Sequence, residues 1–191
     1  MSQKLLLVQK NETESNDIIT VLSSIGYGLV RTIGIDNDIA SISSKFEPDM
    51  IIIDVRRPKR PLIDMISRVF TERPVPVVMF VEESSDSIVS DVIKSGVSGY
   101  VVDGYQRSRV RDVINVARAR FEEKQQLLGE LSEARNALNE RKIIDRAKGI
   151  VMRQKSCDEE SAYTLIRKMA MDKNRRIIDV AQQLVELTDL I

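Results

Sequence analysis

Histidine and tryptophan are absent from this chain, and cysteine occurs once, as Cys157. The lack of His removes the commonest metal ligand and the usual general base, and a single Cys cannot form an internal disulfide. No run of about 18 apolar residues is present, and the apolar part of the N-terminus is too short for a signal peptide. We therefore expect a reduced, cytoplasmic protein that holds no metal or cofactor, has no contact with a membrane and is not an enzyme.

Charge is balanced over the whole chain but not along it. The 29 basic and 29 acidic residues cancel. Residues 141–176, however, hold 11 basic and 5 acidic residues, a net charge of +6, whereas residues 1–105 carry a net charge of −4. A local excess of positive charge is the electrostatic footprint of a surface that binds a polyanion. A solvated helix face is the alternative interpretation of the same charges.

Residues 1–105 alternate short, β-rich apolar runs with amphipathic stretches, a pattern typical of βαβ units on a parallel sheet. The runs predict five strands, at residues 4–8, 28–33, 50–54, 75–81 and 99–102. Helices are predicted between them, at about residues 14–25, 38–46, 61–72 and 86–95. The runs at 51–53 and 77–81 are continuously apolar, which indicates central strands.

A long helix is predicted from Ser108 onward, because no Pro and only two Gly follow. A heptad template can be placed on it with Val110, Ala117, Lys124, Leu131 and Leu138 at a, and Val113, Arg120, Leu127, Ala134 and Arg141 at d. Seven of these ten positions are apolar, which predicts a coiled coil that makes the protein a homodimer. Residues 108–120 are instead expected to pack on their own domain. The predicted division is a domain at 1–107, a helical linker at 108–140 and an all-helical module at 141–191.

The all-helical module is predicted to contain three helical pieces. The first, at residues 140–154, continues the long helix. The second runs from about Glu159 to Met171, and either Ser156 or Asp158 is its N-cap. Its predicted core residues are Ala162, Leu165, Ile166 and Met169. The third helix has an apolar stripe at Ile177, Val180, Ala181, Leu184 and Val185.

Two stretches of the sequence carry a resemblance to known families. In "IIIDVRR" (51–57), Asp54 ends the third predicted strand, and residues 1–105 resemble the flavodoxin-like receiver domain of two-component response regulators, which is phosphorylated at an Asp in that place. Residues 141–184, with "AKGIVM", "EESAYTLIRKMAM" and "DVA", resemble the ANTAR domain, an RNA-binding module of transcription antitermination regulators. The whole chain is similar to the nitrate-responsive antiterminators of that family.

The resemblance also implies which groups should surround Asp54. A working receiver needs two acids after the first strand to hold Mg²⁺, a Thr or Ser after the fourth strand, and a Lys after the fifth. This sequence places other residues there, in chain order Gln9, Lys10, Val81 and Asp103. We therefore expect Asp54 to occupy the phosphoacceptor position of an inactive site. Lys10 is expected to form an internal ion pair with Asp54; the alternative sources of positive charge are Arg56, Arg57 and Lys59.

The resemblance to the ANTAR domain implies an RNA-binding surface. Tyr163, Arg167, Ala170 and Asn174 share one stripe of the second helix, and the first three are expected to form a platform for a flipped loop base. Basic residues around them are expected to hold phosphates: Lys148, Arg153, Lys168, Lys173, Arg175 and Arg176. The alternatives are a partly buried tyrosine at Tyr163 and ordinary solvated charges at the basic positions.

The family resemblance implies a regulator whose free dimer binds RNA hairpins in leader transcripts and is sequestered by a separate nitrate-sensing protein when nitrate is absent. A phosphorylation-switched response regulator with a DNA-binding output is the alternative, although no helix-turn-helix recognition helix stands out. A flavodoxin-like enzyme or nucleotide binder is disfavoured, because "QKNETESN" after the first predicted strand contains no Gly-rich phosphate loop.

Overall fold

The computed structural model describes residues 3–10 and 16–189 of the 191-residue chain. The chain divides into two compact units, Met1–Gln125 and Gln126–Ile191, and each is described by itself. In the described part of the chain, no helix combines the length and the apolar character that crossing a membrane requires.

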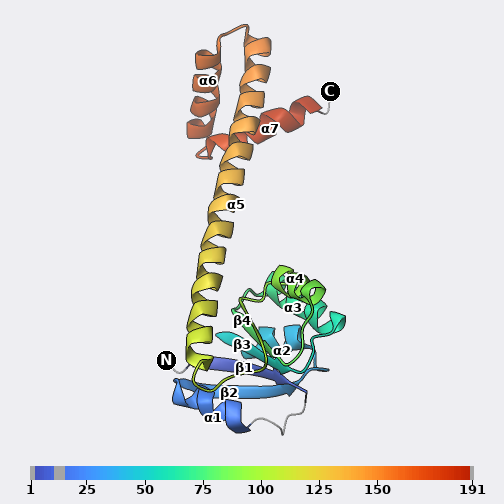
Figure 1. The fold of residues 1–191 in the computed structure, drawn as a ribbon. Coiled ribbons are helices and arrows are strands. Elements are labelled where there is room, and N and C mark those ends of the chain that lie inside the picture. Colours follow the sequence, from blue (N-terminus) through green and yellow to red (C-terminus); the bar gives the residue numbers. More distant parts are fainter. Residues whose placement is uncertain (1–2, 11–15, 190–191) are drawn as a thin grey trace. The chain divides into compact units, whose positions relative to one another are not determined.

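The N-terminal unit is built on a five-stranded parallel sheet with the strand order β2-β1-β3-β4-β5 (Figure 1). Its strands are β1 (Gln3–Gln9), β2 (Tyr27–Gly34), β3 (Met50–Val55), β4 (Val77–Val81) and β5 (Gly99–Val102). The continuous apolar runs of β3 and β4 are buried on both faces of the sheet, and β3 lies at its centre. The predicted five-stranded flavodoxin-like fold is thus confirmed.

Helices cover both faces of this sheet. The helices before β5 are α1 (Asn16–Ser24), α2 (Ile39–Phe46), α3 (Arg60–Glu72) and α4 (Asp86–Lys94). Apolar side chains of α2, α3 and α4 pack on one face, and those of α1 and the start of α5 pack on the other. Residues 14 and 15, with which the first predicted helix begins, lie outside the described residues.

Helix α5 (Val110–Lys155) begins on the sheet of the N-terminal unit. Val110, Ile114 and Ala117 are buried there, and a Cβ added at Gly99 of β5 would lie 3.1 Å from the Cβ of Ala117, so α5 approaches β5 closely at this glycine. The expectation that residues 108–120 pack on their own domain is confirmed. Two predicted a positions, Val110 and Ala117, are therefore unavailable to a coiled coil, and Lys124 lies with its Nζ 4.6 Å from the ring centroid of Phe70.

The C-terminal unit contains the end of α5, α6 (Glu159–Asp172) and α7 (Ile177–Asp189). Helix α6 runs back alongside α5, and α7 crosses them (Figure 1). Asp158, one of the two predicted caps, starts α6 by accepting a hydrogen bond from the Ser161 amide at 2.9 Å. The core holds small and β-branched side chains at Ala147, Ile150, Val151, Ala162, Ile166, Ala170, Val180, Ala181 and Val185.

The predicted core of α6 needs one correction. Ala162, Ile166 and Ala170 lie at i, i+4 and i+8 and form the buried ridge of the helix, with Met169 half-buried beside it. Leu165, which we predicted in the core, is 41% exposed because it lies to one side of that ridge. The apolar pattern alone did not fix the rotation of this short helix.

Candidate functional site

The first candidate site surrounds Asp54 near the end of β3. Asp54 is in register with Gln9 of β1 and with Phe80 of β4. Because side chains alternate along a strand, Asp54 and Gln9 lie on the sheet face that packs against α1 and α5. Burial raises the pKa of the half-buried Asp54 carboxyl, and the nearby Glu82 carboxylate raises it further. A cation beside Asp54 would have lowered this pKa.

Gln9 is the most unusual residue of this pocket. Its side chain is only 3% exposed, and neither its amide nitrogen nor its amide oxygen has a hydrogen-bond partner among the described residues. A buried amide without partners costs free energy. It also carries no charge, so it cannot replace the carboxylate that a receiver presents to Mg²⁺ at this strand end.

The predicted ion pair between Lys10 and Asp54 is wrong. Lys10 is exposed, and Asp54 makes no ion pair or hydrogen bond within residues 3–10 and 16–189. The alternative cation Arg56 also faces elsewhere: its Nη2 lies 2.9 Å from Oε1 of Glu83, and its Nε lies 3.6 Å from Oε2 of Glu82. Arg57 and Lys59 are exposed as well. Among the described residues, the Asp54 carboxylate is thus left without a counter-charge.

The remaining receiver positions differ from the family pattern in geometry as well as in chemistry. Val81 at the end of β4 is fully buried and offers no hydroxyl. Asp103 after β5 is an exposed acid in the left-handed region, with a φ of 69°. Three residues after Val81, the hydroxyl of Ser84 is paired with that of Tyr100, with Oγ 2.6 Å from Oη.

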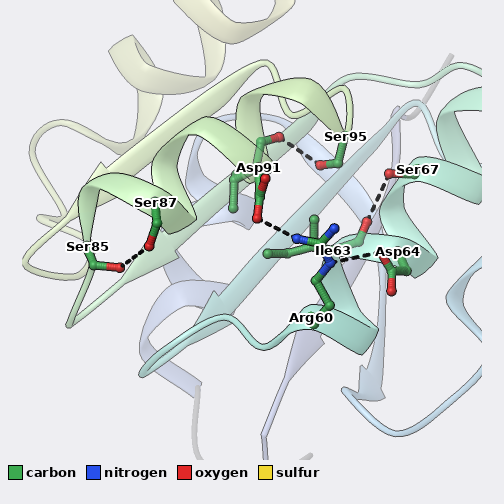
Figure 2. A network of polar contacts seen from close by, with 9 residues as sticks. Arg60, Ile63, Asp64, Ser67, Ser85, Ser87, Asp91 and Ser95 are labelled. Carbon is green, nitrogen blue, oxygen red and sulfur yellow. Dashed lines mark hydrogen bonds and ion pairs between the residues drawn. The ribbon is translucent and has the colours of Figure 1, made fainter.

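Polar contacts hold the elements beyond this pocket in place (Figure 2). The Arg60 guanidinium of α3 pairs with the Asp91 carboxylate of α4 and also with Asp64 one turn on. Arg56 joins the loop after β3 to the loop after β4, since its carbonyl accepts from the backbone amides of Glu82 and Glu83 at 3.0 and 2.9 Å. These contacts tie α4 and its preceding loop to the neighbouring elements.

The pocket does not fit Mg²⁺. A receiver holds the ion with the phosphoacceptor Asp and two acids of the first strand, whereas here Gln9 is neutral and Lys10 is cationic. No group of three or more His, Cys, Asp or Glu side chains that could hold a metal ion occurs within the described ranges.

The second candidate site lies on the C-terminal unit. Tyr163 and Arg167 are exposed on α6, as predicted, and Tyr163 is 43% exposed. Ala170, predicted in the same stripe, is buried in the core and cannot contact a base. Asn174 follows the end of α6 with a φ of 49°. The predicted platform is therefore reduced to Tyr163 and Arg167.

The predicted phosphate-binding residues fall into two groups. Lys148 is held between two carboxylates, with Nζ 2.6 Å from Asp145 Oδ1 and 2.6 Å from Glu159 Oε1, and the hydrogen bonds to these acids raise its pKa. Arg176 Nη2 lies 3.1 Å from Asp179 Oδ1, and its Nη1 lies 4.0 Å from Glu140 Oε1. The second group consists of exposed cations that make no ion pair in the described part of the unit: Arg153, Arg167, Lys168, Lys173 and Arg175.

A groove between α5 and α6 adds a feature that the sequence did not reveal. It has a volume of about 600 Å³ and is open to solvent. Ile144, Met152 and Tyr163 give it apolar surface, and the Asp145, Lys148 and Glu159 cluster gives it a polar edge. Gly149 of the "AKGIVM" motif also lines it. The motif was visible in the sequence, but the groove depends on how α6 packs on α5.

The parallel sheet with an Asp at the end of its third strand is the architecture of a receiver-type domain, and a small helical module follows it. The receiver-type fold agrees with that of the signal receiver domain of a modulated diguanylate cyclase from Desulfovibrio desulfuricans, with a TM-score of 0.55 and 13% identity over 65% of this chain and 99% of that one.

Residues 132–185 match the ANTAR domain family. The chain is 27% identical to the transcriptional regulatory protein PdtaR of Mycobacterium tuberculosis over 184 residues, which cover 96% of this chain and 90% of that protein. It is 39% identical to the nitrate regulatory protein of Klebsiella oxytoca over 80 residues, 42% of this chain and 20% of that protein. Residues 132–185 therefore carry an ANTAR domain behind a receiver-type fold, and these similarities agree with the resemblance to ANTAR antitermination regulators that the motifs predicted.

Proposed function

We propose that the C-terminal unit binds RNA hairpins in leader transcripts and thereby stabilises an antiterminator structure. The observation that carries this proposal is the set of five exposed cations of the C-terminal unit that make no ion pair among the described residues, together with the exposed ring of Tyr163. Phosphates are held by such cations, and unpaired loop bases stack on exposed aromatic rings. The match of residues 132–185 to the ANTAR domain supports the same activity.

The receiver-type domain is proposed to act as a protein-interaction module without phosphorylation. The positions of the two metal-binding acids after the first strand hold Gln9 and Lys10, and Val81 and Asp103 replace the hydroxyl and the lysine of the receiver pattern. A regulatory partner that senses nitrate would bind the chain and withhold it from RNA. The similarity of 80 residues to a nitrate regulatory protein supports nitrate as the signal.

Dimerisation is proposed to occur through the middle of α5. With Val110, Val113 and Ala117 packed on the sheet, the remaining apolar heptad positions are Leu127, Leu131, Ala134 and Leu138. Leu127 and Leu138 are 58% and 59% exposed, which is unusual for leucines on the a and d positions of a helix. Two RNA-binding modules on one dimer would bind two hairpins of one transcript with increased avidity.

The charges beside this seam favour a parallel pair of helices. In the heptad, Glu130 falls at g and Arg135 at the following e position. In a parallel, in-register dimer these are the positions that face each other across the seam, so each chain's Glu130 would meet the Arg135 of the other. Glu130 is already positioned on the helix surface, where it accepts a hydrogen bond from Gln126 at 2.9 Å.

The main test is binding of the full-length protein to a two-hairpin leader RNA and to duplex DNA of the same sequence, measured by gel shift. We expect RNA binding and little DNA binding. Tyr163→Ala and Arg167→Ala are expected to lose hairpin binding while the dimer stays intact, because both side chains are exposed. Lys94→Ala on α4 is the matched control for loss of a surface charge. Equal binding of the duplex DNA would favour the DNA-binding alternative.

The role of the receiver-type domain is tested separately. Incubation with a small phosphodonor and Mg²⁺ is expected to leave Asp54 unmodified in intact-mass spectra, and stoichiometric phosphorylation at Asp54 would contradict the proposal. Addition of the candidate nitrate-sensing protein is expected to release the RNA, and nitrate is expected to restore RNA binding. RNA binding that is unchanged by both the candidate protein and nitrate would contradict the proposed control by a nitrate-sensing partner.

A further inference from the structure

Gly149 lies in the interior of α5, where glycine is unfavourable. A glycine there destabilises the helix relative to alanine, because its backbone loses more conformational freedom on folding. A Cβ added at Gly149 would meet nothing within 4 Å, and its φ is not in the left-handed region. Neither packing against the described residues nor backbone conformation therefore requires glycine at this position, in contrast to Gly99, where an added Cβ would lie only 3.1 Å from that of Ala117.

What distinguishes Gly149 is its place in the groove between α5 and α6. The missing side chain exposes helix backbone on the α5 side, and Tyr163 of α6 lines the same groove. A volume of about 600 Å³ lies within the range of small-ligand sites. The absent Cβ keeps this space open for something that comes from outside the chain.

The charges of the groove select the kind of occupant. Its lining includes three acids, Glu140, Asp145 and Glu159, against two cations, Arg141 and Lys148, so a phosphate would be repelled. A neutral group that offers N–H donors suits it, since Asp145 and Glu159 are acceptors. The five unpaired cations belong to the same unit and remain available for the phosphates on either side of such a group.

We propose that an unpaired base of the RNA loop inserts into this groove, with one face over the Gly149 backbone and its edge toward the Asp145 and Glu159 carboxylates, while Tyr163 packs on it. This inference rests on the proposed RNA binding and adds its base-binding subsite. Lys148 would then fix the two carboxylates in place and would not itself hold a phosphate.

The test compares Gly149→Ala with Gly129→Ala in the full-length protein. Gly129 is also a glycine within α5 with nothing within 4 Å of an added Cβ, but it does not line the groove. Both variants are expected to melt at the wild-type temperature or above it, because alanine favours the helix. Fluorescence anisotropy with labelled hairpin RNA is expected to show at least tenfold weaker binding for Gly149→Ala and none of this loss for Gly129→Ala.

Hairpins in which each loop base in turn is replaced by an abasic site identify the inserted base. One abasic position should weaken wild-type binding strongly and Gly149→Ala binding much less. Wild-type affinity in the Gly149→Ala variant would overturn the subsite while leaving the RNA-binding function intact. A loss of dimer in Gly149→Ala would overturn it in favour of a second copy in the groove. If the wild-type protein binds no hairpin at all, the proposed function itself fails, and the subsite with it.

Discussion

The electrostatic contribution to RNA binding can be tested by comparing two neighbouring residues, Arg175 and Arg176. Both are exposed arginines, but only Arg176 is occupied by carboxylates of its own chain, Asp179 and Glu140. A phosphate that binds Arg175 replaces solvent and counterions. A phosphate that binds Arg176 must compete with two acids, so Arg176 is expected to contribute less.

The size of the effect follows from counterion release. Each phosphate contact adds about 0.7–0.9 to the slope of log K against log salt concentration. Raising the salt fourfold therefore weakens binding by about threefold for each contact. Arg175→Gln is expected to reduce the magnitude of the slope by the contribution of about one phosphate contact, and Arg176→Gln is expected to reduce it by clearly less.

The assay is fluorescence anisotropy of labelled hairpin RNA at salt concentrations between about 50 and 200 mM, the range over which such slopes are resolved. Arg175→Gln and Arg176→Gln keep a polar side chain at each position, so differences in folding are small and are checked by circular dichroism. Equal slopes for the two variants would refute the reasoning, because the ion pairs of Arg176 would then have no influence on the RNA interface.

Three further predictions concern the dimer, the pocket and the core. Replacement of both Leu131 and Leu138 by Glu should yield monomers in analytical ultracentrifugation and weaken binding of two-hairpin RNA much more than that of a single hairpin; a persistent dimer would exclude this seam. For Asp54, the folded-state pKa is raised above its ordinary value of 3.8, so ionisation destabilises the fold as the pH rises through this region. Asp54→Asn should therefore raise the free energy of unfolding in urea at pH 7, with a gain that shrinks as the pH falls toward 3.8; a constant gain would contradict a charge effect. Ile166→Ala should cost the C-terminal unit about 2–5 kcal/mol, since Ile166 is fully buried, and calorimetry should show this unit melting earlier while the receiver-type domain keeps its transition.

The elements of this protein are almost all predictable from its sequence, because each strand is a continuous or nearly continuous apolar run and each helix has a periodic apolar face. The α5 helix illustrates the limit. Its heptad pattern runs from Val110 to Arg141, but the pattern cannot say that Val110 and Ala117 face the sheet of the same chain. Only the packed structure separates a helix face used internally from one left exposed.

The candidate sites show a similar limit at the level of single side chains. The residue types at Gln9, Val81 and Asp103 were enough to predict a changed receiver pocket. They were not enough to place charges: Lys10 is exposed and makes no ion pair with Asp54, and Arg56 pairs with the acids after β4. On α6, the orientation of the helix about its own axis decides that Ala170 is buried and Leu165 exposed, and a short apolar pattern does not define that orientation.

The buried amide of Gln9 has a consequence for how much of the protein is active at any time. An amide neither gains nor loses a proton at physiological pH and holds no divalent ion tightly. The buried side chain of Gln9 therefore stays neutral and free of metal whatever the magnesium concentration. Under the proposed control, the response then depends on the amounts of the two proteins and not on phosphorylation of Asp54. The fraction of chains free to act on RNA follows from the ratio of regulator to partner, and doubling the synthesis of either protein would shift the response.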